Sequence, residues 1–422
     1  MSAQVDVQAL AAAAPEAQRR YAEFLTAGMK LDLTRGKPCL AQLNLSEAML
    51  ALPGDGEHAT SEEGDLRNYG GAPKGLHQLR DMFAPLLDVP VDQLVARDNA
   101  SLALMHLCVA SSFFHTVPGG TAPWRPGEVT FLAPSPGYDR HFAICDELGV
   151  RLRTVAMTED GPDMDEVEAL VADDPTIKGI WCVPKYSNPT GVTYSDETVR
   201  RLATMPTAAA DFRIYWDNAY AVHHLEDQHD DLLAILPECE AAGHRDRVFM
   251  FASTSKITFP GAGVSFFASS PANVAWFLAR DVARSIGPDK LNQLRHLRFF
   301  TDTAGVSSHM DAHRMLIAPK FTATIDALDT DLGALGVASW TRPRGGYFIS
   351  LDVVPGTARR VVELAKAAGV ALTPAGATYP GGVDPHDANI RIAPTFPTTA
   401  DLQQAMAVLT TCVIIAAAEQ LL

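Results

Sequence analysis

The sequence predicts an α/β fold, with a mostly parallel central sheet in a large domain and a smaller α+β domain. Two observations support this prediction. Short apolar segments with strand character alternate with helical segments through the middle of the chain, as in parallel sheets covered on both faces. The C-terminal part instead reads as antiparallel strands combined with helices. At 422 residues, the chain is long enough for two domains.

The apolar segments of the middle part predict strands at residues 128–134, 151–157, 179–184, 213–220, 247–253 and 263–269. Helical patterns follow the first and the third of these strands, at residues 139–150 and 195–205. Ser195 can accept a hydrogen bond from the first turn of the second helix, so it is the expected N-cap.

In the C-terminal part we predict antiparallel strands within 340–353, a helix at 357–370, a strand at 388–396 and a final helix that begins near Thr398. The predicted division is a large domain at 49–308 and a small C-terminal domain at 309–422. Residues 1–48 are expected to form an N-terminal segment and part of the small domain.

Charge and composition argue against several classes of protein. The net charge is −16, whereas binding to nucleic acid or to an anionic membrane needs a basic surface. No run of 18 apolar residues is present, and the N-terminus lacks the basic region of a signal peptide. The six cysteines show no CxxC spacing, which fits buried reduced thiols. We therefore expect a cytoplasmic protein that binds neither nucleic acid nor membrane.

Polar residues stand at the ends of three successive predicted strands, where ligands of open α/β sheets bind. Asn188 lies in "KYSNPTG" after the strand at 179–184. Asp217 interrupts the apolar strand "RIYWDNAY", and Tyr220 follows three residues later. Lys256 comes just after the strand at 247–253. Taken singly, these residues are ordinary turn, cap and surface residues, but their combination predicts one site.

Asn, Asp-x-x-Tyr and Ser-x-x-Lys in this order resemble the fold-type I pyridoxal-phosphate enzymes, specifically the class I and II aminotransferases. The resemblance covers nearly the whole chain, and further matching segments are "RNYGGAPKGLHQLR" (67–80), "DNASLALMH" (98–106), "SPGYDRHF" (135–142) and "NIRIAP" (389–394). Segments 33–38, 291–300 and 309–321 are similar to a bacterial subgroup. That subgroup holds aspartate-aminotransferase-like proteins and proteins labelled as MocR-family aminotransferases.

The resemblance implies pyridoxal 5'-phosphate as the cofactor and assigns roles around its ring. Lys256 would bond to the cofactor aldehyde, and Asp217 would pair with the protonated ring nitrogen. Asn188 and Tyr220 would donate hydrogen bonds to the phenolic oxygen. Tyr138 would stack on the ring.

The resemblance also assigns the phosphate and the substrate. The backbone N–H groups of Ala100 and Ser101, at the start of a helix, would hold the phosphate with help from the Ser253 hydroxyl. Tyr69 would reach the phosphate from a neighbouring subunit, which implies a homodimer with shared active sites. Arg391 would bind the α-carboxylate of an amino acid or a 2-oxo acid. Arg35 is the candidate for the distal carboxylate of aspartate or glutamate.

One departure from the family pattern concerns the phosphate. The family commonly carries a phosphate-binding arginine seven or eight residues after the lysine, where this sequence has Gly263 and Val264. Amides, hydroxyls and Tyr69, or a basic residue elsewhere, must then meet the phosphate charge.

Several alternatives stay open at this point. The same site could support β-elimination or cyclisation of the 1-aminocyclopropane-carboxylate type. A ligand-sensing MocR-like domain would need a basic DNA-binding region ahead of the fold, but roughly 30 residues precede "LDLTRGKP" and the chain is acidic. His309 and His313 are spaced i, i+4 but lack the glutamate of an HExxH motif, so we expect no metal site. His223, His224 and His229 are expected to be solvated.

Overall fold

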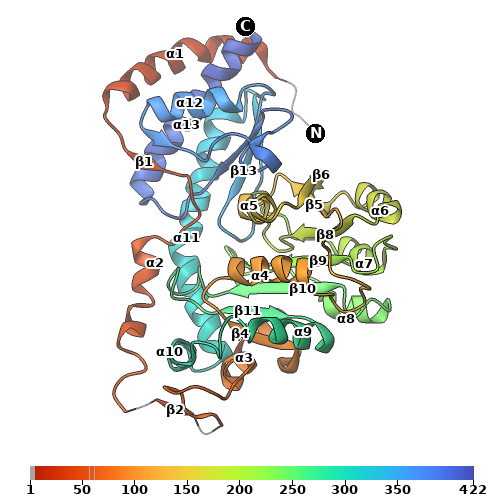
Figure 1. Cartoon of the computed structure of the whole chain (residues 1–422). Helices are drawn as coiled ribbons and strands as arrows, with labels where there is room; N and C mark the ends of the chain where they lie inside the picture. Colours follow the sequence, from red (N-terminus) through yellow and green to blue (C-terminus); the bar gives the residue numbers. More distant parts are fainter. Residues whose placement is uncertain (1–4, 57, 61) are drawn as a thin grey trace.

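The structure is a computed structural model, and it describes residues 5–56, 58–60 and 62–422. An eight-stranded sheet forms the larger body (Figure 1). Its strands are, in spatial order, β4 (Leu94–Arg97), β11 (Ser265–Ala268), β10 (Val248–Ser253), β9 (Arg213–Asp217), β8 (Ile177–Cys182), β5 (Thr130–Ser135), β6 (Arg151–Thr158) and β7 (Gly161–Pro162).

The predicted fold class is confirmed. Strands β10, β9, β8, β5 and β6 are parallel, whereas β11 is antiparallel to β10 and β4, and β7 is antiparallel to β6. All predicted strands of the middle part are present in this sheet. The sequence did not reveal β4 and β7, because such short strands depend on pairing with a distant neighbour rather than on their own pattern.

Alternating side chains of the central strands enter two different cores, so both faces of the sheet are covered. Tyr215 and Phe249 pack under α4 (Ser101–Phe114), α5 (Asp139–Leu148) and α9 (Pro271–Asp281). Ile214 and Met250 face the opposite way. The helices on that side are α3 (His77–Phe83), α6 (Met164–Asp173), α7 (Asp196–Thr204), α8 (Ile235–Ala241) and α10 (Lys290–Phe300). Ser195 caps α7 as predicted, with its Oγ accepting from the Thr198 N–H at 3.3 Å.

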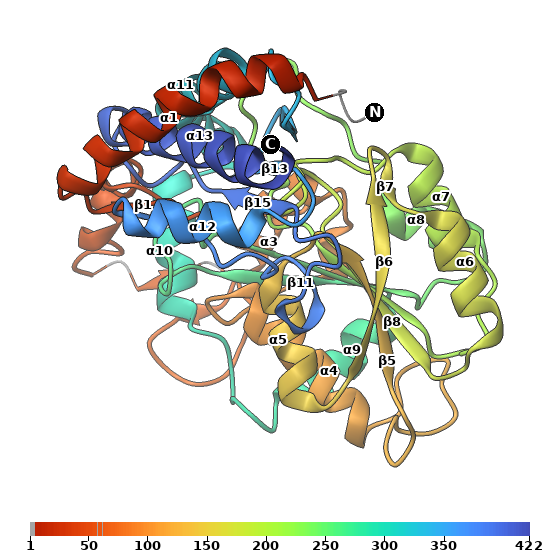
Figure 2. The ribbon, with the colours of Figure 1, turned by 90° about the horizontal axis from the view of Figure 1, so that it is seen from above.

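The smaller body is an antiparallel sheet of β12 (Ala338–Trp340), β13 (Ile349–Val353) and β15 (Asn389–Ile392). It packs with α12 (Ala358–Ala367), α13 (Thr399–Leu421) and α1 (Val7–Thr26) around a core of its own. Figure 2 shows α1 lying along α13, and β1 (Leu31–Asp32) pairs with β14 (Val370–Ala371). The N-terminal segment therefore joins the C-terminal part of the chain.

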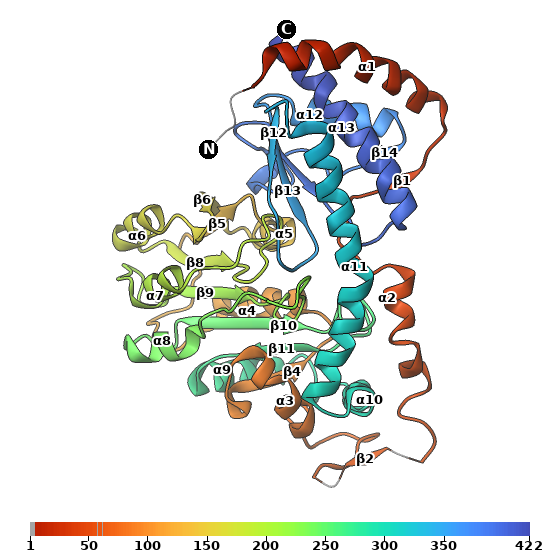
Figure 3. The ribbon, with the colours of Figure 1, turned by 180° about the vertical axis from the view of Figure 1, so that it is seen from behind.

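The long helix α11 (Thr303–Leu332) runs from one body to the other, beside the short helix α2 (Leu40–Asn44) (Figure 3). Val306 and Met310 of α11 belong to the larger core, whereas Ile317 and Leu328 belong to the smaller one. The domain boundary predicted at 308/309 falls inside α11. Because this helix belongs to both bodies, the division into domains at that position stays a prediction.

Some remaining elements are short. A two-stranded hairpin consists of β2 (Ala59–Thr60) and β3 (Gly64–Asp65), and 3-10 turns occur at Glu47–Ala51, Pro85–Leu87, Val91–Gln93 and Pro380–Gly382. Within the described ranges, α13 is the one helix long and apolar enough to cross a membrane. Since 72% of its apolar window is buried, it is a core helix of the smaller body.

Candidate active site

A small cavity lies at the carboxyl ends of β8, β9 and β10, where they meet the starts of α4 and α5. Its volume is about 120 Å³. The cavity brings together every sequence-predicted cofactor residue other than Tyr69, namely Ala100, Ser101, Tyr138, Asn188, Asp217, Tyr220, Ser253 and Lys256. Their assembly follows from the topology, because parallel strands deliver their carboxyl ends to one edge of a sheet.

Asp217 is the last residue of β9, and its carboxylate is buried. Oδ2 lies 3.0 Å from His141 Nε2, and the His141 ring stacks on Trp181 with centroids 4.4 Å apart. Oδ1 is buried and has no partner among the described residues. Because buried carboxylate oxygens normally accept hydrogen bonds, Oδ1 marks a place for a donor from outside the chain.

The lysine amine is held near the aromatic wall of the same cavity. Nζ of Lys256 lies 5.0 Å from the centre of the Tyr220 ring. Burial lowers the pKa of Lys256 below its ordinary value, and the negative charge of Asp217 partly opposes this shift. The neutral, nucleophilic form of the amine is therefore more populated at Lys256 than at a surface lysine.

Tyr138, Tyr220 and Asn188 supply the other polar groups. Burial raises the pKa of both tyrosines, so each phenol keeps its proton and can donate a hydrogen bond. Asn188 is buried, and its Oδ1 accepts from Arg391 Nη1 at 3.2 Å. Because this bond uses only the oxygen of the Asn188 amide, its N–H₂ group can still donate to a ligand.

Hydroxyl and amide groups also line the cavity. Ala100, the N-cap of α4, has no side-chain oxygen, and in the described part of the chain no side chain accepts from the first N–H groups of that helix. Ser101, Ser253 and Ser255 line the cavity beside them. A Cβ on Gly263 would lie 2.9 Å from Thr254 Oγ1, so this position has no room for the usual arginine. Lys256 is the one basic residue among the described residues of this lining.

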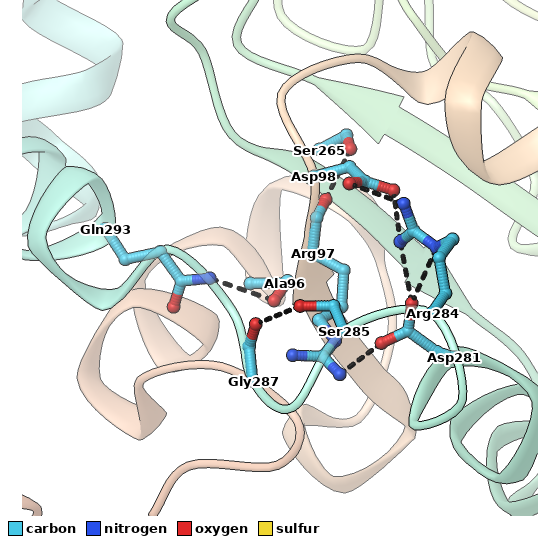
Figure 4. A network of polar contacts seen from close by, with 9 residues as sticks. All are labelled: Ala96, Arg97, Asp98, Ser265, Asp281, Arg284, Ser285, Gly287 and Gln293. Atoms are coloured by element: carbon cyan, nitrogen blue, oxygen red, sulfur yellow. Dashed lines mark hydrogen bonds and ion pairs between the residues drawn. The ribbon is translucent and has the colours of Figure 1, made fainter. Parts of the chain in front are cut away.

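An ion-pair network anchors the turn that leads into α4 (Figure 4). Arg284 Nη2 donates to Asp98 Oδ2 and to Asp281 Oδ1, both at 2.6 Å. Asp281 also pairs with Arg97, and both of those side chains are buried. Asp98 has a φ of 55°, in the left-handed region, so its two bonds to Arg284 help to hold a strained backbone position. Neither arginine lines the cavity, and the network therefore positions the turn.

A larger cavity of about 560 Å³ adjoins the first and shares Tyr138, Asn188, Tyr220 and Lys256 with it. Arg391 and Arg35, the predicted substrate residues, both line it. Arg391 Nη1 also donates to Asp139 Oδ1 at 2.9 Å. Arg35 is exposed, and among the described residues no carboxylate pairs with it.

Two groups of predicted residues lie elsewhere or differ from expectation. Tyr69 is 82% exposed and lines neither cavity, so its role across a dimer interface stays a prediction. The interpretation of His223 as solvated is wrong, because the side chain is buried against Tyr220 and Tyr347. Sequence spacing could not show that its loop folds inward.

His309 and His313 contact each other, with Nε2 atoms 3.1 Å apart, and His313 Nδ1 lies 3.0 Å from Gln42 Nε2. Among the described residues, no group of three histidine, cysteine or acidic side chains could hold a metal ion.

Nearly the whole chain matches a known family. The family model described as "Aspartate amino-transferase" matches residues 5–422. The chain belongs to the aspartate aminotransferase family. It is 49% identical over 403 residues to the aspartate aminotransferase of Corynebacterium glutamicum, covering 95% of this chain and 93% of that protein. It is 55% identical over 408 residues to a Mycolicibacterium smegmatis protein classed by name with the aminotransferases, covering 96% and 95% of the two chains.

Solved structures agree with this family. An aspartate transaminase structure from Corynebacterium glutamicum matches with a TM-score of 0.95 and 46% identity, covering 100% of both chains. The α-aminoadipate aminotransferase LysN of Thermus thermophilus matches with a TM-score of 0.73 at 21% identity, covering 96% and 98%, and shares the fold. The protein is thus an aminotransferase of fold type I.

Several side chains of this aminotransferase site were not predicted from the sequence, among them Asp139, His141, Phe348 and Thr373. His141 carried a usable signal, since it follows Tyr138 by three residues on a predicted helix and so lies on the same side. The other three meet Arg391 through tertiary contacts that no local pattern shows.

Proposed function

We propose that this aminotransferase uses pyridoxal 5'-phosphate to move an amino group between an amino acid and a 2-oxo acid, with aspartate or glutamate as the preferred donor. The unpartnered Oδ1 of Asp217 is the observation that carries the proposal. A buried carboxylate oxygen facing a lysine amine across one small cavity calls for a cationic donor between them. A protonated pyridine nitrogen is such a donor.

The rest of the lining fits the same group. The open N–H groups at the start of α4, with the hydroxyls of Ser253 and Ser255, suit a phosphate without any arginine. Tyr138 provides an aromatic ring at the wall, and Lys256 provides the amine for the covalent bond. His141 would orient Asp217 through the contact between its Nε2 and Asp217 Oδ2.

When bound, the cofactor supplies an electron-withdrawing ring that stabilises negative charge on the substrate α-carbon. Lys256 Nζ, whose pKa is lowered by burial, would take the proton from that carbon as a general base. Asp217 Oδ1 would hold the proton on the ring nitrogen. The Asn188 amide and the Tyr220 hydroxyl would donate to the phenolic oxygen, and Arg391 would fix the α-carboxylate.

Arg35 favours a dicarboxylic substrate. Three cations besides Arg391 and Lys256 line the 560 Å³ cavity: Arg35, Lys37 and Arg140. Lys37 lies 3.5 Å from Asp32 and over the Phe396 ring, and Arg140 lies 3.9 Å from Asp139. Arg35, with no such partner among the described residues, is the best placed to bind a distal carboxylate.

A homodimer with shared sites is part of the proposal. Three large side chains with apolar surface are open to solvent here: Tyr69 is 82% exposed, Ile286 68% and Val282 62%. Lys290 Nζ donates to the Gly70 carbonyl at 2.6 Å and fastens the Tyr69 segment beside the start of α10. A second copy that covers this surface could place its Tyr69 at the phosphate end of the cavity. Location in the cytoplasm, lack of nucleic-acid and membrane partners, and membership of the subgroup with MocR-labelled proteins stay predictions.

Incubation of the purified protein with aspartate and 2-oxoglutarate tests the function. Formation of glutamate with loss of the cofactor's visible absorbance supports transamination. Elimination would instead release pyruvate and ammonia, without glutamate, from an amino acid that carries a leaving group on its β-carbon. Cyclisation would convert an amino acid with a leaving group on its γ-carbon into a cyclic amino acid. Binding without turnover would support a sensing role.

A further inference from the structure

Arg391 has a carboxylate partner within the protein itself. Nη1 donates to Asp139 Oδ1 at 2.9 Å and to Asn188 Oδ1 at 3.2 Å. Nη2 has a single long contact, to Thr373 Oγ1 at 3.4 Å, and Nε has no partner among the described residues. A guanidinium carries five N–H donors, so this one keeps free donors and has a single counter-ion, Asp139.

Asp139 is well placed to hold this position in the absence of substrate. It is the first residue of α5, where a negative charge is stabilised by the helix dipole. The Arg391 side chain is 6% exposed and that of Asp139 31%, so the carboxylate is the solvated member of the pair. Both line the 560 Å³ cavity, and the Phe348 ring lies 4.9 Å from the guanidinium carbon. Without Asp139, Arg391 would be a buried charge with no counter-ion.

We propose that Asp139 is a positioning residue that acts as the resident counter-ion of Arg391 and weakens the binding of substrate and product carboxylates. This inference rests on the proposed role of Arg391. An incoming carboxylate meets an arginine whose charge is already balanced, and it must share Arg391 with Asp139 or displace it. Arg140, whose Nε lies 3.9 Å from Asp139 Oδ2, is available to pair with a displaced Asp139. The product carboxylate therefore dissociates readily from Arg391, although the Arg391 side chain is buried.

The affinity of the holoenzyme for butanoate tests this role, because butanoate has one carboxylate and no amino or oxo group that could react. Titration calorimetry would compare the wild type with Asp139→Asn, which keeps the size and one acceptor oxygen but removes the charge. We expect the Kd to fall about tenfold, the effect of one partly solvated charge pair. The ligand-free Tm should fall as well, since Arg391 loses its counter-ion. A residue that only shapes the structure would weaken binding and stability together, so unchanged or weaker butanoate binding overturns the inference.

Controls separate this inference from the function it rests on. Asp146→Asn makes the same charge change at the exposed end of α5 and should alter neither value. Asp139→Glu should restore the weaker binding, and Asp139→Ser replaces the asparagine variant if that protein does not fold. If butanoate binds Arg391→Gln and the wild type with the same Kd, Arg391 does not bind the carboxylate. That result would refute both the proposed role of Arg391 and the inference about Asp139. Binding that needs Arg391 but is not strengthened in Asp139→Asn refutes the inference alone.

Discussion

His141 Nε2 lies 3.0 Å from Oδ2 of Asp217, while Oδ1 of the same carboxylate has no partner in the described part of the chain. The histidine thus fixes the orientation of Asp217 while one oxygen stays available inside the cavity. In the proposed function, this arrangement would let the carboxylate pair with the cofactor ring nitrogen while it keeps its contact with His141 of α5.

Asp217→Asn should keep the cofactor but lose turnover, because an uncharged amide no longer holds a proton on the ring nitrogen. We expect kcat to fall about 100- to 1000-fold, or roughly 3–4 kcal/mol, on the scale of a broken buried ion pair. Steady-state kinetics and the cofactor content by absorbance measure the two effects. A variant with a near wild-type rate would show that Asp217 only supports the fold.

The rate at which Lys256 reacts with free pyridoxal phosphate should rise at a lower pH than the rate for an ordinary lysine. Burial lowers the pKa of Lys256, so the rate of covalent capture in cofactor-free protein should rise at lower pH than for a free lysine, whose pKa is about 10.4. Asp217→Asn removes the opposing charge and should move the midpoint lower still. Borohydride reduction and peptide mass spectrometry would follow the label, and labelling chiefly at Lys185 would contradict the assignment.

The same shift affects stability, and its sign can be stated. The unfolded chain binds a proton at this lysine more readily than the folded one, so the free energy of unfolding should rise with pH up to about pH 10.4. Lys256→Met should flatten this part of the profile in cofactor-free protein, as measured by urea unfolding at several pH values. If the slope of the free energy of unfolding against pH is the same in Lys256→Met, groups other than Lys256 cause that slope.

Shared active sites can be tested by mixing inactive subunits. Tyr69→Ala and Lys256→Ala dimers should each be impaired, but a mixed dimer has one intact site. Random exchange makes about half of the dimers mixed, so activity should recover to about one quarter of the wild type. No recovery after confirmed exchange, or a fully active monomer in sedimentation, would refute the shared site.

Arg35→Ala should erase the preference for dicarboxylic donors. We expect the wild type to favour aspartate over alanine by about 10- to 100-fold in kcat/KM, the value of one charge-assisted hydrogen bond. The variant should retain its rate on alanine, and Lys30→Ala, an exposed cation of the same segment, serves as the control. A wild type that already prefers aromatic donors would rule out the distal role of Arg35.

The residues of the ion-pair network at the turn that leads into α4 should contribute unequally to stability. Asp281→Ala leaves the buried Arg97 without a charged partner, which should cost about 3–5 kcal/mol in the free energy of unfolding. Arg284→Ala removes an exposed arginine and should cost about 1 kcal/mol or less. Urea unfolding monitored by fluorescence compares them, and equal losses would show that Arg97 is supported in another way.

Part of the site could be predicted from sequence because it follows from strand order. Asn188, Asp217 and Lys256 each stand at the end of a parallel strand, and such ends meet at one edge. The pairing of Arg391 with Asp139 could not be predicted, because it spans 252 residues and depends on how the smaller body sits over α5. The inward position of His223 likewise depends on tertiary packing, since its loop carries no periodic pattern.

The helix α11 contributes side chains to both hydrophobic cores. If either core unfolds, α11 loses part of its packing, and the core that remains is then destabilised. The helix is 30 residues long and has no flexible linker at the point where the cores meet. The two bodies are therefore expected to melt as one cooperative unit, with a single calorimetric transition. For the same reason, a fragment that starts at residue 309 would begin inside α11, and its Met310 would lack the larger core against which it packs. We therefore expect that the smaller body does not fold when it is expressed alone.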